Sequence, residues 1–132
     1  MYGSWLAGMT ISTTSVALHH KLCHILGGLG LPHAETHSIV LPHAMAYNRE
    51  AAPHAMARIG RALGSADAAG GLYALEGRLG IPMRLADTGM KEADLERGAR
   101  GALEAPYPNP RKVEYEPVFR RLRDAYGGRR PS

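Results

Sequence analysis

The segment from His19 to His43 constrains the fold more than any other part of this chain, and it reads HHKLCHILGGLGLPHAETHSIVLPH. Glycines at 27, 28 and 30 separate two apolar stretches of helical spacing, and glycine readily adopts the left-handed geometry that ends a helix. Pro32 then suits the first turn of a second helix. The same segment holds six of the seven histidines and the only cysteine. We expect two helices joined by a short turn, with the chemistry of the chain gathered where they meet.

The rest of the chain favours the same kind of structure. Its 132 residues, 45% of them hydrophobic, are enough for one domain with a real core. Runs in which β-branched or aromatic residues recur at every second position are almost absent, which argues against a β-sheet. A proline-rich segment, 105–111, reads as a loop. We predict an all-α bundle of about six helices, over residues 5–26, 33–47, 52–63, 68–79, 91–103 and 114–126.

The first two predicted helices carry special features. The first is apolar on more than one face, so we expect it to be central and buried. In the second, Pro42 cannot donate to the carbonyl of Ser38, which predicts a kink or a break. Residues 1–20 have no charged side chain, but they lack a basic start and are rich in glycine, serine and threonine. A buried helix is therefore favoured over a targeting segment or a membrane span.

Charge and cysteine content narrow the classes of function. The net charge is +4, and most of it arises in the last 22 residues, where acidic side chains are interleaved with the basic ones. This pattern favours a solvated helix face and a basic tail over a nucleic-acid site. A single cysteine cannot form an internal disulfide, so a reduced, cytoplasmic setting fits best.

Four histidines form two pairs at helical spacing. His20 and His24 lie on one face of the first helix, and His33 and His37 repeat that spacing on the second. The two pairs can converge on one ion or one substrate, since neutral imidazole is a common transition-metal ligand. The alternative is that they are surface or hydrogen-bonded core residues, and from spacing alone that is the commoner case. No Cys-x-x-Cys spacing strengthens the metal interpretation.

The other histidines and the cysteine favour structural roles. For His43, next to Pro42, we favour a hydrogen-bond donor at the kink over a cleft residue. His19 is expected to pack or hydrogen-bond, and His54 to be exposed. Cys23 is interpreted as a small buried residue and not a nucleophile. The glycines do not form a dinucleotide loop, because a helix and not a strand precedes them.

The chain resembles, over nearly its whole length, the C-terminal domain of iron-containing (group III) alcohol dehydrogenases. Within that family it is most similar to the maleylacetate reductase branch. The residues that carry the likeness are ALHHKLCHILGG, LPHAETHSIVLPHAMAYN, YPNPR and DAYGGRRP. The resemblance implies a helical, dehydroquinate synthase-like fold. By motif position it implies His20 and His33 as metal ligands, and His24 and His37 as catalytic side chains of the cleft.

The family also has an N-terminal α/β nucleotide-binding domain, and the opening MYGSWLAG resembles the family beyond that domain. We therefore expect residues 1–132 to be a single C-terminal-type domain that lacks the Rossmann-like domain and the early Asp and His ligands. The expected partners are the missing domain or a second copy of the chain, and a small maleylacetate-like substrate, with no nucleic acid or membrane.

A complete enzyme of this kind would use NADH or NADPH, with iron or zinc as a candidate metal, to reduce the carbon–carbon double bond of maleylacetate to 3-oxoadipate in aromatic-compound degradation. The resemblance implies NAD(P)H binding here only if another segment supplies the nucleotide-binding domain, so we expect the chain to be inactive alone. Two alternatives stay open: a non-catalytic helical remnant that self-associates, and a stand-alone histidine metal-binding protein.

Overall fold

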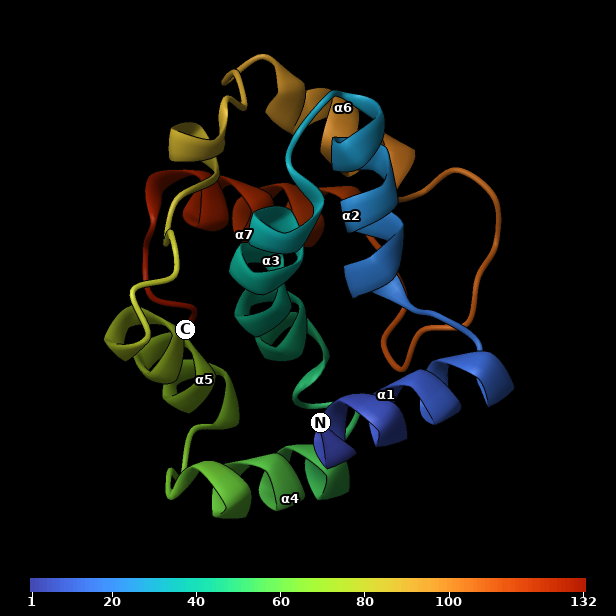
Figure 1. Ribbon diagram of the computed structural model, residues 1–132. Coiled ribbons are helices and arrows are strands. Elements are labelled where there is room, and N and C mark those ends of the chain that lie inside the picture. The colour runs from blue at the N-terminus through green and yellow to red at the C-terminus, as the bar shows by residue number, and fades with distance from the viewer.

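Helix α3 (His33–Asn48) is the central element of the molecule, and α2, α5, α7 and the short 3-10 helix η1 pack against it (Figure 1). The computed structural model describes all 132 residues and contains no β-strand, which confirms the all-α prediction. None of the helices combines the length and apolar character needed to cross a bilayer. The elements are α1 Tyr2–Thr13, α2 Leu18–Gly28, α3 His33–Asn48, α4 Pro53–Leu63, α5 Ala68–Arg78, η1 Leu85–Thr88, α6 Asp94–Gly101 and α7 Tyr115–Gly127.

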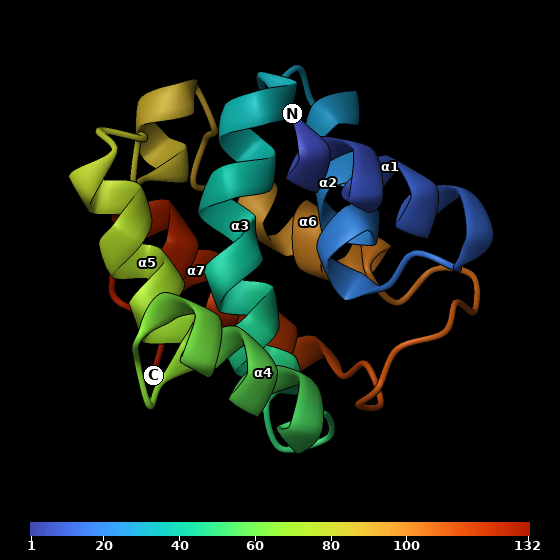
Figure 2. The same ribbon diagram turned by 60° about the horizontal axis from the view of Figure 1, so that its bottom comes forward.

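The interior consists of two apolar clusters. The larger one lies between α2, α3, α6 and α7 and includes Leu22, Leu26, Val40, Tyr47 and Leu122. In the smaller one, α5 packs on both α3 and α4 (Figure 2). Helix α6 approaches the larger cluster closely at Gly98, where an added Cβ would lie 2.7 Å from the Leu122 side chain. Any larger residue at that position requires the Leu122 side chain or α6 to shift.

The N-terminal region corrects the prediction of one buried helix over 5–26. The structure has two helices, separated by extended backbone at Thr14 and Ala17. Hydroxyl side chains gather before this interruption, and those of Thr10, Thr13 and Thr14 all donate to backbone carbonyls one turn earlier, bonds that slightly destabilise a helix. Helix α1 buries no residue, so the expected burial was wrong for this half.

Helix α3 is continuous through Pro42, so the predicted break does not occur. Pro42 is itself buried, and packing on the neighbouring helices holds this part of α3 in place. The remaining helices begin and end within a few residues of prediction. The largest difference is in α6, which begins at Asp94 and not at residue 91, because the Asp94 carboxylate accepts from the Lys91 amide (3.2 Å) in a preceding turn.

The proline-rich segment 105–111 is a loop, as predicted, and one side chain holds it in place. Asn109 forms a reciprocal amide pair with Asn48 at the end of α3, with hydrogen bonds of 2.8 and 3.1 Å. Its oxygen also accepts from the backbone amide of Leu18 (3.3 Å), the first residue of α2. This bond satisfies one of the amides that every helix start leaves unpaired. The loop, α2 and α3 are thereby fixed to one another.

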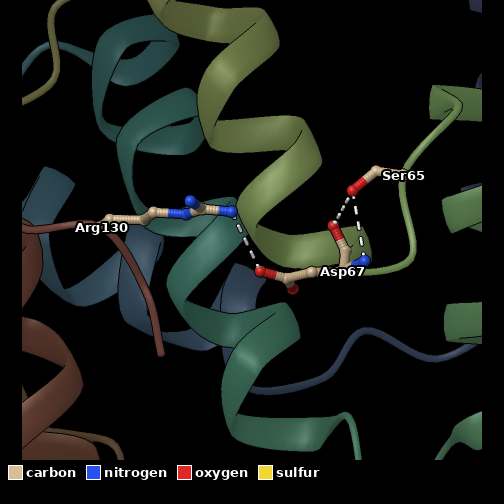
Figure 3. A network of polar contacts seen from close by, with 3 residues as sticks. All are labelled: Ser65, Asp67 and Arg130. Carbon is tan, nitrogen blue, oxygen red and sulfur yellow. Dashed lines mark hydrogen bonds and ion pairs between the residues drawn. The ribbon is translucent and has the colours of Figure 1, made fainter.

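The C-terminal tail is attached to the start of α5 by a small polar network (Figure 3). The Arg130 guanidinium lies 3.4 Å from the carboxylate of Asp67. The Asp67 amide in turn donates to Ser65 Oγ (3.2 Å), and that hydroxyl donates back to the Asp67 carbonyl (2.8 Å). Both charged side chains are substantially exposed, so this ion pair positions the tail with little gain in stability.

Candidate functional site: a histidine cluster between α2 and α3

Histidines from α2 and α3 converge where the two helices pack side by side. The ring centroids of His20 and His24 are 4.6 Å apart, and those of His33 and His37 are 4.1 Å apart. The His20 and His37 rings join the two pairs at 5.3 Å. Helical spacing places each pair on one face, and the short turn after Gly28 brings the faces together. All four predicted site residues therefore belong to one cluster.

His19 supports this cluster from the side. Its Nε2 donates to the backbone carbonyl of His37 at 2.9 Å, because a carbonyl can only accept. The His19 ring also meets the His37 ring edge-on at 5.0 Å. The predicted packing and hydrogen-bonding role of His19 is confirmed, and it fixes α2 against α3 next to the site.

The environment keeps imidazoles of the cluster neutral. Burial, and to a smaller extent the neighbouring histidines, lower the pKa of His37 to about 4. The pKa of His20 is also lowered, first by burial and then by His24 and His33. His37 Nε2 is buried without a hydrogen-bond partner. A neutral ring nitrogen without a partner is the form in which histidine binds a metal or accepts a proton.

Cys23 lies close to the cluster but is chemically quiet. Its sulfur and ring nitrogens of His19 and His37 all lie within 4.8 Å of one another, so three side chains of metal-ligating types meet here. Burial raises the pKa of the thiol to about 12, so it stays protonated at neutral pH. The sulfur lies 3.9 Å from the Thr36 carbonyl, and the residue is 1% exposed. These contacts confirm Cys23 as a small buried residue.

A pocket of about 250 Å³ opens beside His20 and His24. Its other lining residues are Val16, Lys21 and Tyr107. Sequence reasoning missed the last two. Lys21 is the only cationic side chain between His19 and His43, which is a usable signal, whereas Tyr107 reaches the pocket only through the fold of the proline-rich loop.

His43 and His54 lie outside the cluster. His43 is 2% exposed, and neither of its ring nitrogens has a hydrogen-bond partner, so the predicted donor role at Pro42 is wrong. Its ring faces Tyr73 edge-on at 6.4 Å, and it lines a core cavity of about 10 Å³. His54 is exposed, as predicted.

Fold and site together define a helical domain that presents clustered imidazoles, a donor set suited to a transition metal or to proton transfer. The chain belongs to the Fe-containing alcohol dehydrogenase family, because the family model for the C-terminal region matches residues 1–126.

Named relatives agree with this assignment. Maleylacetate reductase of Pseudomonas aeruginosa is 50% identical over 100% of this chain and 38% of its own length. The crystal structure of maleylacetate reductase from Rhizobium sp. strain MTP-10005 is 44% identical, with a TM-score of 0.93, over 98% of this chain and 37% of that one. An iron-containing alcohol dehydrogenase from Corynebacterium glutamicum is 39% identical over the same shares, with a TM-score of 0.90. The chain thus spans under two-fifths of the proteins it matches.

Proposed function

We propose that this chain forms the histidine-bearing wall of the active site in a maleylacetate reductase-like, NAD(P)H-dependent oxidoreductase of aromatic-compound degradation. The convergence of His20, His24, His33 and His37 on one cluster is the observation that carries the proposal. The 50% identity to a maleylacetate reductase supports the choice of substrate. Another segment or chain supplies the nucleotide-binding part, and the assembled protein works in the cytoplasm.

The cluster fits a divalent transition metal such as iron or zinc, because four imidazoles converge in it and the buried Nε2 of His37 has no hydrogen-bond partner. His20 and His33 would hold the ion, one from each helix. When bound, it would polarise an oxygen of the substrate as a Lewis acid. The nitrogen donors of this wall need oxygen or nitrogen ligands from elsewhere to complete four-coordination.

Reduction of a carbon–carbon double bond consumes one hydride and one proton. A reduced nicotinamide, when bound, would supply the hydride for one carbon, and a protein group would deliver the proton to the other. His24 is exposed and lines the pocket, so it is placed to pass that proton to a bound molecule. The His37 ring packs against the rings of both His20 and His33 and so connects the two pairs of histidines.

Complementation tests this proposal. The N-terminal part of the Pseudomonas aeruginosa relative is produced separately and mixed with the 132-residue chain, and oxidation of NADH by maleylacetate is followed. We expect no turnover with the chain alone and turnover with the mixture. His24→Ala should lower kcat by roughly 10²- to 10⁴-fold, as loss of a general acid does. His54→Ala, at an exposed position outside the cluster, is the matched control. Full activity in the His24→Ala mixture would refute the role of this residue.

A stand-alone metal-binding protein is the second candidate, and the buried, unpartnered His37 Nε2 favours it. The two functions differ in one observation. Metal binding by the chain with no NADH oxidation in any complemented mixture would favour the metal-binding protein over the oxidoreductase.

A further inference from the structure

The pocket beside His20 and His24 has a lining that is informative about its ligand. Its volume of about 250 Å³ is below the range of about 300–1,000 Å³ that holds drug-sized molecules. Val16 and the ring of Tyr107 give it an apolar side, and Lys21 gives it a cation. No acidic residue lines it. The pocket therefore suits a small molecule that has both a short carbon chain and a negative group.

Lys21 has no acidic partner in the chain. None of the six ion pairs includes it. Its nitrogen lies 6.0 Å from the centroid of the Tyr107 ring, at the edge of cation–π range. An ammonium group next to an aromatic face and without a carboxylate is free to pair with an anion from solution.

The two sides of this pocket are held in place before any ligand arrives. Tyr107 donates its hydroxyl proton to the Ala102 carbonyl at 2.8 Å, which fixes the ring. The loop that carries it is bound to α2 and α3 through Asn109. Lys21 lies between His20 and His24 on α2, and its amide donates to the Ala17 carbonyl at 3.1 Å. The Tyr107 ring and the segment of α2 that carries Lys21 thus have fixed relative positions.

We propose that Lys21, with the Tyr107 ring beside it, is a carboxylate subsite that selects small organic acids and directs the rest of the molecule toward His20 and His24. The proposal rests on the proposed function, because it takes this pocket as the substrate pocket. It adds the residue that makes the selection: the Lys21 ammonium pairs with a carboxylate of the substrate, so neutral alcohols and carbonyl compounds of similar size bind less well.

A binding experiment on the chain alone tests the subsite without any turnover. Metal-free protein carrying isotope labels in its histidine and lysine side chains is titrated with maleate, and separately with maleamide, its uncharged diamide. We expect maleate to shift the His20, His24 and Lys21 NMR signals in a saturable way, with no such shift by maleamide. Lys21→Met should weaken maleate binding by about tenfold or more, the loss typical of a charged hydrogen bond. Lys21→Arg should retain binding, because it keeps the cation.

Lys91→Met is the matched control, since it removes the same charge from an exposed lysine outside this pocket. The amide spectra of all variants establish that each is folded. Unchanged maleate binding in Lys21→Met, equal shifts by maleamide, or no maleate binding to the wild-type chain would overturn the subsite. Lys21-dependent maleate binding without NADH oxidation in the complemented mixture would leave the subsite standing and refute the oxidoreductase.

Discussion

The Nε2 of His19 donates a 2.9 Å hydrogen bond to the backbone carbonyl of His37, and this bond connects α2 to α3 next to the histidine cluster. His19 is one residue before His20, and the rings of both lie against His37, but only His19 bonds to the His37 backbone. His20 faces His24 and His37, while His19 joins the helices. Neighbouring histidines on one helix thus divide into a supporting residue and a site residue.

Removing this hydrogen bond should loosen the site before it unfolds the protein. We expect His19→Phe to keep the ring packing on His37 and lose the bond, at a cost of about 1 kcal/mol in the free energy of unfolding. Urea denaturation followed by circular dichroism measures it. His54→Phe, on an exposed position, is the control and should change stability little. A loss equal to that of the control would show that the bond contributes nothing.

His43 should make the domain sensitive to acid. Burial lowers its pKa from 6.5 to about 4 in the folded state, so the unfolded chain binds a proton more readily. The free energy of unfolding is therefore not reduced by His43 above pH 6.5, and it decreases as the pH drops toward 4. His43→Leu should be at least as stable as wild type at pH 7 and lose less stability by pH 5. Urea midpoints at the two pH values measure this, and parallel losses in both proteins would contradict it.

Glu76 should make the domain less stable as the pH rises, whereas His43 makes it less stable as the pH falls. It is 6% exposed on α5 with no ion pair, and burial raises its pKa from 4.5 to about 7. Its contribution to stability is present below pH 4.5 and is lost as the pH rises to 7. Glu76→Gln should therefore stabilise the domain at pH 8 by roughly 1 kcal/mol and leave it nearly unchanged at pH 4. Glu50→Gln, exposed after α3, is the matched control. Thermal unfolding at both pH values distinguishes them.

Metal binding by the chain should depend on one histidine from each helix. A His20→Ala, His33→Ala double variant should lower the affinity for Zn²⁺ by more than about 100-fold, the largest effect usual for groups that only support a ligand. Isothermal titration with Zn²⁺ at neutral pH measures the affinity. His54→Ala should bind as wild type does. Unchanged affinity in the double variant would exclude the cluster as the metal site.

Helix α1 should make the chain self-associate. It buries none of its residues, and Tyr2, Trp5 and Ile11 are all more than half exposed. An apolar surface of this kind usually marks an interaction site. Light scattering should give a mass that rises with protein concentration, and Trp5→Asp should reduce that rise. A monomer at all concentrations would contradict the prediction.

Glycine and proline residues in the sequence predict where several helices begin and end. Pro53 begins α4, Gly64 ends it in a left-handed conformation, and Gly128 does the same for α7. Glycine and proline act locally, so these ends could be predicted within a residue or two. The break after α1 was missed because apolar residues continue the helical spacing on both sides of it, and the low helix propensity of serine and threonine is a weak signal beside that spacing.

The site was predictable only in part, because sequence patterns are local and part of the site depends on contacts between distant segments. The pairing of His20 with His24 and of His33 with His37 depends on helical spacing, which the sequence displays. The pocket beside His20 and His24 depends on Tyr107, which lies more than eighty residues further along the chain. Its position follows from the bond network around Asn109, and no local rule connects that residue to Asn48 or Leu18.

Trp5 is the only tryptophan of the chain, and it lies on α1, which no part of the core covers. Its indole emission will therefore report what α1 touches and not whether the domain is folded. Unfolding of the α2, α3, α6 and α7 core will change the tryptophan fluorescence little. Docking of a second copy or of another protein segment onto α1 will shift the emission to shorter wavelength. The chain thus carries a natural optical label for assembly, separate from any measure of its stability.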